Sequence, residues 1–222
     1  MYIYNNFPDP KFAPDDMPLC VGGNLNPETL INAYKKGIFP WFLENEPILW
    51  WSPNPRAVLS PKEIRVQKSM KPFLNRYSVK FDYDFESLIN LCFNQRQKEG
   101  ATWLSQDIVN AYTKLYHMGI AHSVEVYNKS NKLIGGLYGL IFGKLFCGES
   151  MISIEKNASK TALIYLCKTL EKYNFLIDCQ ISNPHLKFMG SRNISRDKFL
   201  EISKILISQE VIDFKKLKPI YN

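Results

Sequence analysis

The segment Leu176-Ile-Asp-Cys-Gln180 combines an apolar run with two polar side chains that can take part in chemistry. Asp178 and Gln180 are two residues apart, so on a β-strand their carboxylate and amide lie on the same face. Polar groups at the end of a buried strand commonly converge on a ligand. The pair is therefore a candidate catalytic site, and the alternative is that both side chains cap neighbouring turns.

A second carboxylate, Glu149, lies within the apolar segment 146–151. Burial of an unpaired carboxylate among apolar residues costs free energy, so this side chain needs a partner. It either pairs with a structural cation or awaits a cationic substrate, and the sequence favours neither alternative. Gly148 beside it would allow close approach to the backbone.

The chain contains four tryptophans, Trp41, Trp50, Trp51 and Trp103, and the first and last lie in segments that we expect to be loops. Most tryptophans pack in a core or support a loop. A base stacked on an indole, however, gains about 1–3 kcal/mol without any reading of its sequence. Trp41 and Trp103 are thus candidates to hold a nucleotide end.

The net charge of +7 is unevenly distributed along the chain. Residues 1–60 carry four basic and six acidic side chains, whereas residues 61–80 carry six basic residues and one acidic residue. Arg65, Lys68 and Lys71 lie in this second stretch, and basic residues gathered in this way favour a polyanionic partner. A solvated basic face is the alternative.

The cysteines and histidines lack a metal-binding pattern. Five cysteines are widely spaced without a Cys-x-x-Cys motif, and His117 and His122 miss the spacing of four that places two ligands on one helix face. We expect reduced, mostly buried thiols, no metal and no cofactor. No apolar run approaches the roughly 18–20 residues of a membrane span, and the first residues lack signal-peptide features. We therefore expect a soluble, cytoplasmic protein.

Residues 1–60 are rich in proline and aromatic residues and form the first predicted domain. One helix is predicted there, with Asn26 as N-cap, Pro27 in the first turn and Gly37 as its stop. The segments that follow neither alternate like a strand nor repeat like a helix, so we expect an ordered loop. We place a domain boundary near residues 53–61.

Residues 61–222 predict a second, mixed α+β domain. Apolar alternation predicts strands and helically spaced apolar residues predict helices, with Asp84 and Ser195 as N-caps. The predicted order is a strand, two helices, three antiparallel strands, a crossover helix, a strand and a last helix. The strands are expected near 79–83, 122–127, 132–141, 145–151 and 175–180, with a tight hairpin turn at Gly143-Lys144 and the crossover helix over 158–172.

Several sequence blocks in the same order resemble the leucyl/phenylalanyl-tRNA–protein transferase family. These blocks are Gly22-Gly-Asn-Leu, Gly37-Ile-Phe-Pro-Trp-Phe, Pro47-Ile-Leu-Trp-Trp-Ser-Pro-Asn-Pro-Arg, Gly135-Gly-Leu-Tyr-Gly, Leu145-Phe-Cys-Gly-Glu-Ser-Met, Asn157-Ala-Ser-Lys-Thr-Ala-Leu and Leu176-Ile-Asp-Cys-Gln. The resemblance runs from about Leu19 to Gln180. It implies a small N-terminal domain and an acetyltransferase-like (GNAT-like) C-terminal domain with a mixed sheet.

The resemblance also implies an activity and a set of site residues. Leu or Phe, and also Met, would move from aminoacyl-tRNA to proteins with N-terminal Arg or Lys and mark them for degradation in the N-degron pathway. The residues that match the family's site are Asp178, Gln180 and Glu149 for catalysis, Trp41 and Trp103 for the terminal adenosine, Leu137, Met151, Leu166 and Leu170 for the amino-acid side chain, Arg65, Lys68 and Lys71 for the tRNA backbone, and Glu149 and Asn183 for the acceptor.

Two other functions are compatible with parts of the sequence. An acyl-CoA-dependent N-acetyltransferase would share the fold, but such enzymes bind pyrophosphate on a glycine-bearing loop before the crossover helix. The corresponding segment, Ser153-Ile-Glu-Lys-Asn-Ala-Ser-Lys160, has no glycine. A non-catalytic RNA-binding module would use the basic stretch and the tryptophans, but it leaves Asp178 and Gln180 unexplained.

Overall fold

A seven-stranded mixed sheet forms the centre of the computed structural model, which describes residues 6–100 and 104–220. The strand order is β10-β4-β9-β8-β7-β6-β5, and among the described residues only β8 and β9 pair in parallel. The strands are β4 (Arg56–Leu59), β5 (Ser78–Phe81), β6 (Ala121–Tyr127), β7 (Leu133–Phe142), β8 (Leu145–Ser153), β9 (Leu176–Gln180) and β10 (Arg192–Ile194). The predicted α+β fold with a mixed sheet is confirmed.

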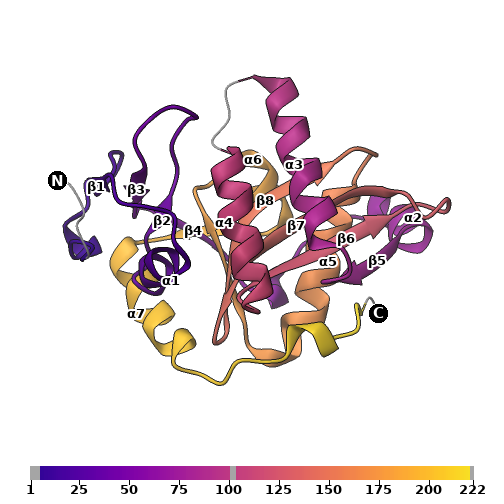
Figure 1. The fold of residues 1–222 in the computed structure, drawn as a ribbon. Helices are drawn as coiled ribbons and strands as arrows, with labels where there is room; N and C mark the ends of the chain where they lie inside the picture. The colour runs from indigo at the N-terminus through magenta and orange to yellow at the C-terminus, as the bar shows by residue number, and fades with distance from the viewer. Residues whose placement is uncertain (1–5, 101–103, 221–222) are drawn as a thin grey trace.

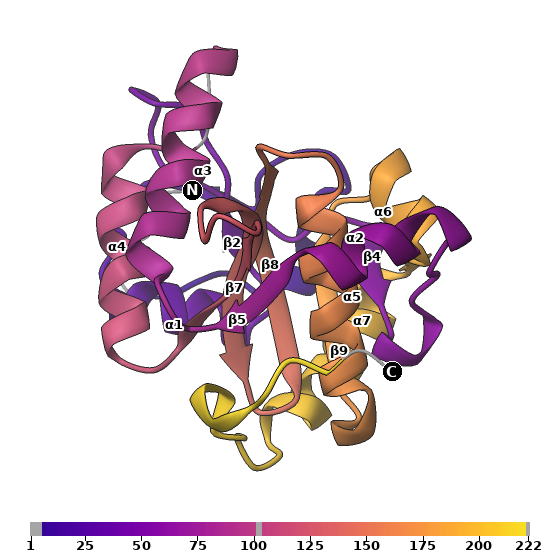
Figure 2. The ribbon, with the colours of Figure 1, turned by 90° about the vertical axis from the view of Figure 1, so that its right-hand side faces the viewer.

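Helices cover both faces of this sheet, as Figure 2 shows. Helices α3 (Phe85–Glu99) and α4 (Gln106–His117) lie on one face, and α5 (Ala158–Leu170) lies on the other. The carboxylate of Asp84 accepts a hydrogen bond from the backbone N–H of Ser87, so the predicted cap of α3 is confirmed. The resulting two apolar cores hold the sheet between the helical layers.

The connections around β8 follow the sequence signals. Gly143 has a φ of +57° in the turn between β7 and β8, and a Cβ there would lie 2.2 Å from the carbonyl oxygen of Leu206. Only glycine fits this predicted hairpin turn. A parallel strand pair needs a long crossover, and α5 supplies it between β8 and β9.

The N-terminal part contains helix α1 (Pro27–Lys35) and a small antiparallel sheet of β1 (Cys20–Val21), β3 (Leu49–Trp51) and β2 (Phe39–Pro40). The expectation that the segments after α1 form only an ordered loop is wrong, since β2, β3 and β4 lie there. Each of these strands has two to four residues, too few for alternation to show in the sequence. Buried Trp50 anchors the small sheet through its pairing with Cys20.

Strand β4 joins the N-terminal part to the main sheet, because it pairs with β9 and β10. The division of the chain at residue 60 stays a prediction. Two further short elements, α6 (Pro184–Met189) and β10, were not predicted, whereas Ser195 caps the predicted last helix α7 (Arg196–Ile207). In Figure 1, α7 lies against α1, so the C-terminal region packs on the N-terminal part.

The remaining elements are short. They are α2 (Lys71–Arg76) and the 3-10 helices η1 (Pro10–Phe12), η2 (Pro61–Glu63), η3 (Lys68–Met70), η4 (Glu171–Tyr173) and η5 (Phe214–Lys216). No helix in the described ranges has the length and apolar character needed to cross a bilayer.

Candidate active site

A cavity of about 350 Å³ opens where strands β8 and β9 separate. Their parallel pairing ends at Cys147 and Asp178, so the backbones of the two strands no longer pair beyond this point. Glu149 and Gln180 follow directly, and both line the cavity together with Asp178. The tertiary structure thus brings the three predicted catalytic residues together at one strand end.

Glu149 is held by neutral hydrogen-bond donors. The amide Nε2 of Gln180 donates to its Oε1 at 2.8 Å, and the hydroxyl of Tyr112 donates to its Oε2 at 2.9 Å. The Tyr112 hydroxyl is also hydrogen-bonded to that of Tyr34, so the network reaches from α1 through α4 to β9. Both of these partners of Glu149 are thus uncharged hydrogen-bond donors.

Burial changes the protonation of Glu149. Desolvation raises the pKa of its carboxyl to about 7, although the hydrogen bonds from the tyrosines and Gln180 favour the charged form. The group therefore changes charge near neutral pH. The sequence analysis did not single out Tyr112, because only the fold brings this residue of α4 to Glu149 of β8.

Asp178 is paired with an arginine that the sequence analysis did not single out. Arg56 of β4 donates from Nε to Oδ1 at 2.8 Å and from Nη2 to Oδ2 at 2.7 Å, and each side chain is 1% exposed. Charge pairing with Asp178 raises the pKa of Arg56 despite its burial. The only signal in the sequence is that Arg56 ends the block Pro47-Ile-Leu-Trp-Trp-Ser-Pro-Asn-Pro-Arg.

Much of the cavity lining is apolar. Leu137, Met151 and Leu166, predicted for the amino-acid pocket, line the cavity. Leu170 does not, because it lies one turn further along α5 and is fully buried in the core. Further apolar lining residues include Phe39, Pro40, Phe146, Leu163, Ile177, Ile181 and Leu186.

Trp41 lines the cavity where it meets the small N-terminal sheet and is 43% exposed. Its ring packs edge-on against Trp51 at a centroid distance of 5.4 Å, and the Trp51 indole N–H donates to the Trp41 carbonyl oxygen at 2.6 Å. This packing leaves part of the Trp41 ring available to a ligand. Trp103 lies outside the described residues.

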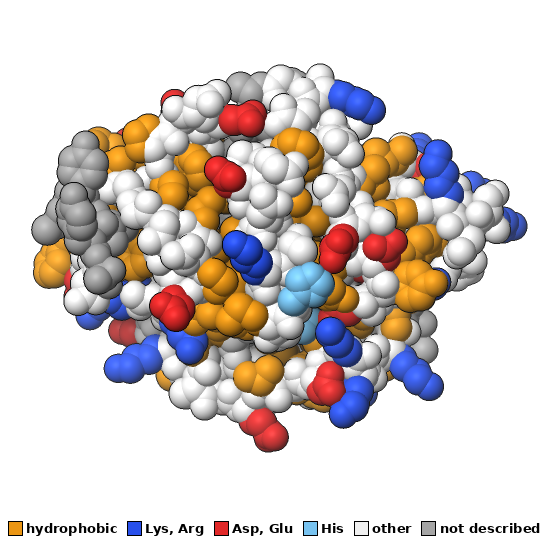
Figure 3. Space-filling view, in the orientation of Figure 1, with side chains coloured by type: hydrophobic (Ala, Val, Ile, Leu, Met, Phe, Trp, Pro, Cys, Tyr) orange, Lys and Arg blue, Asp and Glu red, His pale blue; other side chains and the backbone are white. Residues whose placement is uncertain are grey.

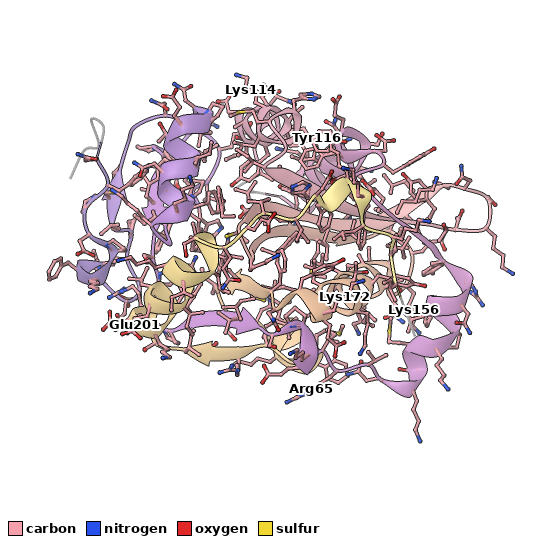
Figure 4. The ribbon with its side chains drawn as sticks, turned by 90° about the horizontal axis from the view of Figure 1, so that it is seen from below. Arg65, Lys114, Tyr116, Lys156, Lys172 and Glu201 are labelled. Atoms are coloured by element: carbon pink, nitrogen blue, oxygen red, sulfur yellow. The ribbon has the colours of Figure 1, made fainter. Side chains whose placement is uncertain are left out.

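The predicted tRNA-contacting residues Arg65, Lys68 and Lys71 are exposed and do not line the cavity. Arg65 lies at the lower edge of Figure 4, on the opposite side of that view from Lys114. Figure 3 shows Lys and Arg side chains at the right-hand end of its face, where α2 and the β6–β7 turn lie in Figure 1. The basic stretch therefore faces solvent.

Asn183, predicted to contact the acceptor, lines the cavity on the segment after β9. Its side-chain oxygen accepts from the backbone N–H of Leu186 at 2.8 Å and so caps α6. Its amide nitrogen is the part of this side chain left for other contacts.

Comparison with known proteins gives one consistent family. The family described as leucyl/phenylalanyl-tRNA protein transferase matches residues 58–204, and the family described as its N-terminal domain matches residues 23–54. Proteins named leucyl/phenylalanyl-tRNA–protein transferase from Campylobacter jejuni subsp. doylei and Psychromonas ingrahamii are 48% and 46% identical to this chain. The alignments cover 94% of both chains in the first case, and 87% of this chain and 83% of the relative in the second.

The mixed sheet, the strand-end cavity and these matches define an aminoacyltransferase, an enzyme that transfers an amino acid from tRNA to a protein. The chain belongs to the leucyl/phenylalanyl-tRNA–protein transferase family.

Proposed function

We propose that this enzyme transfers Leu, Phe or Met from aminoacyl-tRNA to the N-terminal Arg or Lys of acceptor proteins in the cytoplasm, which marks them for degradation in the N-degron pathway. The main support is the cavity itself, because Leu137, Met151 and Leu166 line the same cavity as Glu149 and Gln180. An unbranched or γ-branched apolar side chain would pack against these apolar residues. Its ester would then lie beside the polar groups.

The proposed chemistry needs little beyond positioning. The acceptor's α-amine has a pKa of about 8, so a useful fraction is neutral near pH 7. The amine nitrogen attacks the ester carbonyl, the bond to the ribose oxygen breaks, and the proton lost by the amine ends on that oxygen. Orientation of two reactants contributes roughly 7–11 kcal/mol to such a step.

Gln180 is the residue proposed to orient the amine. Its Nε2 already donates to Glu149, so its side-chain oxygen is the atom that can accept a hydrogen from the incoming amine. Asp178 would act on Gln180 rather than on the acceptor, because both of its oxygens accept from Arg56. Glu149 and Asn183 would contact the acceptor's first residue.

The tRNA would be bound by two kinds of contact. Trp41, together with Trp103, is proposed to stack on the terminal adenosine, and Arg65, Lys68 and Lys71 are proposed to contact the phosphates. Phosphate contacts dominate affinity without reading sequence. This combination suits an enzyme that must accept several different tRNAs.

The start of α5 speaks against the acyl-CoA alternative. The Ser153 hydroxyl accepts from the backbone N–H of Ser159 at 2.8 Å, so the chain itself occupies the position where a pyrophosphate would bind. The carboxylate of Glu155 lies nearby and accepts from Asn128 at 2.6 Å. A negative charge at this helix start would repel a pyrophosphate.

Transfer of labelled Leu from Leu-tRNA to a peptide that begins with Arg is the direct test, repeated with Phe-, Met- and Ile-tRNA. We expect transfer from Leu-, Phe- and Met-tRNA, and a fall in kcat of about 100-fold in Gln180→Ala, because the amine loses its orienting acceptor. A peptide that begins with Ala is the control for the acceptor. Near-normal turnover of Gln180→Ala would remove Gln180 from the mechanism.

The tRNA contacts are tested by the salt dependence of binding. We expect Lys68→Ala with Lys71→Ala to weaken tRNA binding and to make the slope of log K against log salt shallower by about 1–2, since two phosphate contacts are lost. The matched control is Lys114→Ala with Lys204→Ala, which removes two exposed lysines from other helices. Equal slopes in both double variants would exclude this basic stretch as a tRNA contact.

A further inference from the structure

Gln180 has an unusual backbone conformation for a residue with a side chain. Its φ is +59°, in the left-handed region that disfavours a Cβ atom. Such a conformation persists only when the surrounding structure holds it, and it is found mostly at functional sites. Because the backbone sets the direction of the side chain, whatever holds this φ also directs the Gln180 amide toward Glu149.

Asp178 stabilises the left-handed conformation of Gln180. Its Oδ1 accepts a hydrogen bond from the backbone N–H of Gln180 at 2.9 Å, as in an Asx turn. Opposite this point the pairing of β4 with β9 shifts register between Ala57 and Val58. Asp178 pairs with Val58 and Gln180 pairs with Ala57, so one residue of β9, Cys179, is left over between the two pairs. The hydrogen bond from the Gln180 N–H to the Asp178 carboxylate spans this irregularity.

Arg56 in turn fixes the carboxylate of Asp178. Its planar guanidinium makes two parallel hydrogen bonds to the two oxygens, which sets the plane of the carboxylate as well as its position. The guanidinium lies between the rings of Phe39 and Phe199, at 4.8 Å and 4.5 Å from their centroids, and Nη1 donates to the carbonyl oxygen of Gly37 at 3.2 Å. Arg56 is thus held by the N-terminal part, by α7 and by β9 at once.

We infer that Arg56 is a positioning residue of the transfer reaction, which acts through Asp178 on the backbone of Gln180. The inference rests on the role proposed for Gln180. Phe39 both stacks on Arg56 and lines the cavity. The position of the N-terminal part, which contains Phe39, therefore affects the direction of the Gln180 amide through Arg56 and Asp178. The guanidinium itself does not touch the substrate.

The test is Arg56→Lys, measured by Leu transfer to the Arg-starting peptide. Lysine keeps the charge but cannot form two parallel hydrogen bonds with the carboxylate. We expect kcat to fall by roughly 10- to 100-fold, as for a small misplacement of a reacting group, with the KM for Leu-tRNA within about twofold of wild type. Because a loss of folded enzyme would also lower the apparent kcat without changing KM, the kcat is first corrected for the folded fraction. An unchanged KM then separates misplacement of the reacting groups from weaker binding of Leu-tRNA.

Arg196→Lys is the matched control. Arg196 is also a buried arginine, but it donates to the carbonyl oxygens of Ser52 and Pro14 and has no contact with β9 among the bonds of the described residues. Its kcat, corrected for the folded fraction, is expected to equal that of wild type. An equal fall in both variants would overturn the inference.

The double variant Arg56→Lys/Gln180→Ala separates this role from a structural one. If Arg56 acts through Gln180, the double variant has the kcat of Gln180→Ala within about twofold, the margin for independent sites. If the fall in kcat of the double variant equals the product of the falls in the two single variants, the inference is overturned. If Arg56→Lys does not fold, Asp178→Asn, which also breaks the two-bond pairing, takes its place in the same comparison.

Failure of the inference is distinct from failure of the proposed function. If the wild-type enzyme transfers Leu but Arg56→Lys retains its kcat, only the inference falls. If Gln180→Ala has normal turnover, the role of Gln180 and that of Arg56 both fall, while aminoacyl transfer stands. If the wild type transfers nothing to the Arg-starting peptide, the proposed acceptor is wrong.

Discussion

Replacement of Asp178 by alanine is expected to lower the free energy of unfolding by about 3–5 kcal/mol, because it leaves a buried arginine without its counter-ion. Arg56 and Asp178 are each 1% exposed, so water cannot replace the lost carboxylate. Urea unfolding of the wild type and of Asp178→Ala measures the difference. A free energy of unfolding within about 0.5 kcal/mol of that of wild type, the usual range of surface substitutions, would contradict the prediction.

The double variant Arg56→Met/Asp178→Leu provides the control for this effect. Apolar residues of similar volume often replace a buried ion pair without loss of stability. We therefore expect the double variant to recover most of the lost stability while kcat stays low, since nothing then holds the backbone N–H of Gln180. The comparison matters for any assay of Asp178, because the single alanine variant loses both stability and catalytic geometry.

The transfer rate is expected to fall as the pH drops below about 7, the pKa to which burial raises the carboxyl of Glu149. Above this pH the carboxylate accepts from the Gln180 Nε2 and leaves the amide oxygen toward the cavity. Below it, the protonated carboxyl can donate to that oxygen and turn the amide around. The rate then falls by up to tenfold per pH unit from this group alone.

Glu149→Gln isolates this contribution from that of the acceptor. Protonation of the attacking amine, with a pKa of about 8, also slows the reaction at low pH. We expect the variant to lose the inflection near pH 7 and to keep the one that belongs to the amine. The control is Glu155→Gln, whose carboxylate contacts Asn128 outside the cavity and which should keep the wild-type profile. Two unchanged inflections in Glu149→Gln would refute the assignment.

The same pKa shift predicts how stability depends on pH. The folded protein binds a proton at Glu149 more tightly than the unfolded chain does, whose pKa is 4.5. The contribution of this group to stability is thus fully present below pH 4.5 and is lost as the pH rises through about 7. Glu149→Gln lacks this loss, so its stability relative to wild type should increase between these pH values.

Local signals in the sequence were enough for most of the main fold. Asp84 and Ser195 cap their helices because a cap needs only a side chain and a backbone N–H three residues away. Gly143 marks its hairpin turn because the required φ depends on one residue. The strands β6, β7 and β8 are long enough for their apolar character to show.

The short strands were not predicted by the same local signals. Strand β3 has three residues and β4 has four, and all four residues of β4 are buried, so no alternation marks it. What makes β4 a strand is its place between β9 and β10, which lie more than a hundred residues later in the chain.

The sequence by itself determined which residue types could do the chemistry and the order of the elements that carry them. Asp178 and Gln180 could be singled out because a carboxylate and an amide at the end of an apolar strand are recognisable within five residues. Only the tertiary structure decided the partners of the site residues: Arg56 lies 122 positions from Asp178, and Tyr112 of α4 reaches Glu149 of β8. It also left Leu170 in the core while Leu166 lines the cavity. The physical reason is the separation along the chain over which each interaction acts. Helix caps and periodicity involve a few neighbouring residues, whereas ion pairs and cavities depend on how distant elements pack.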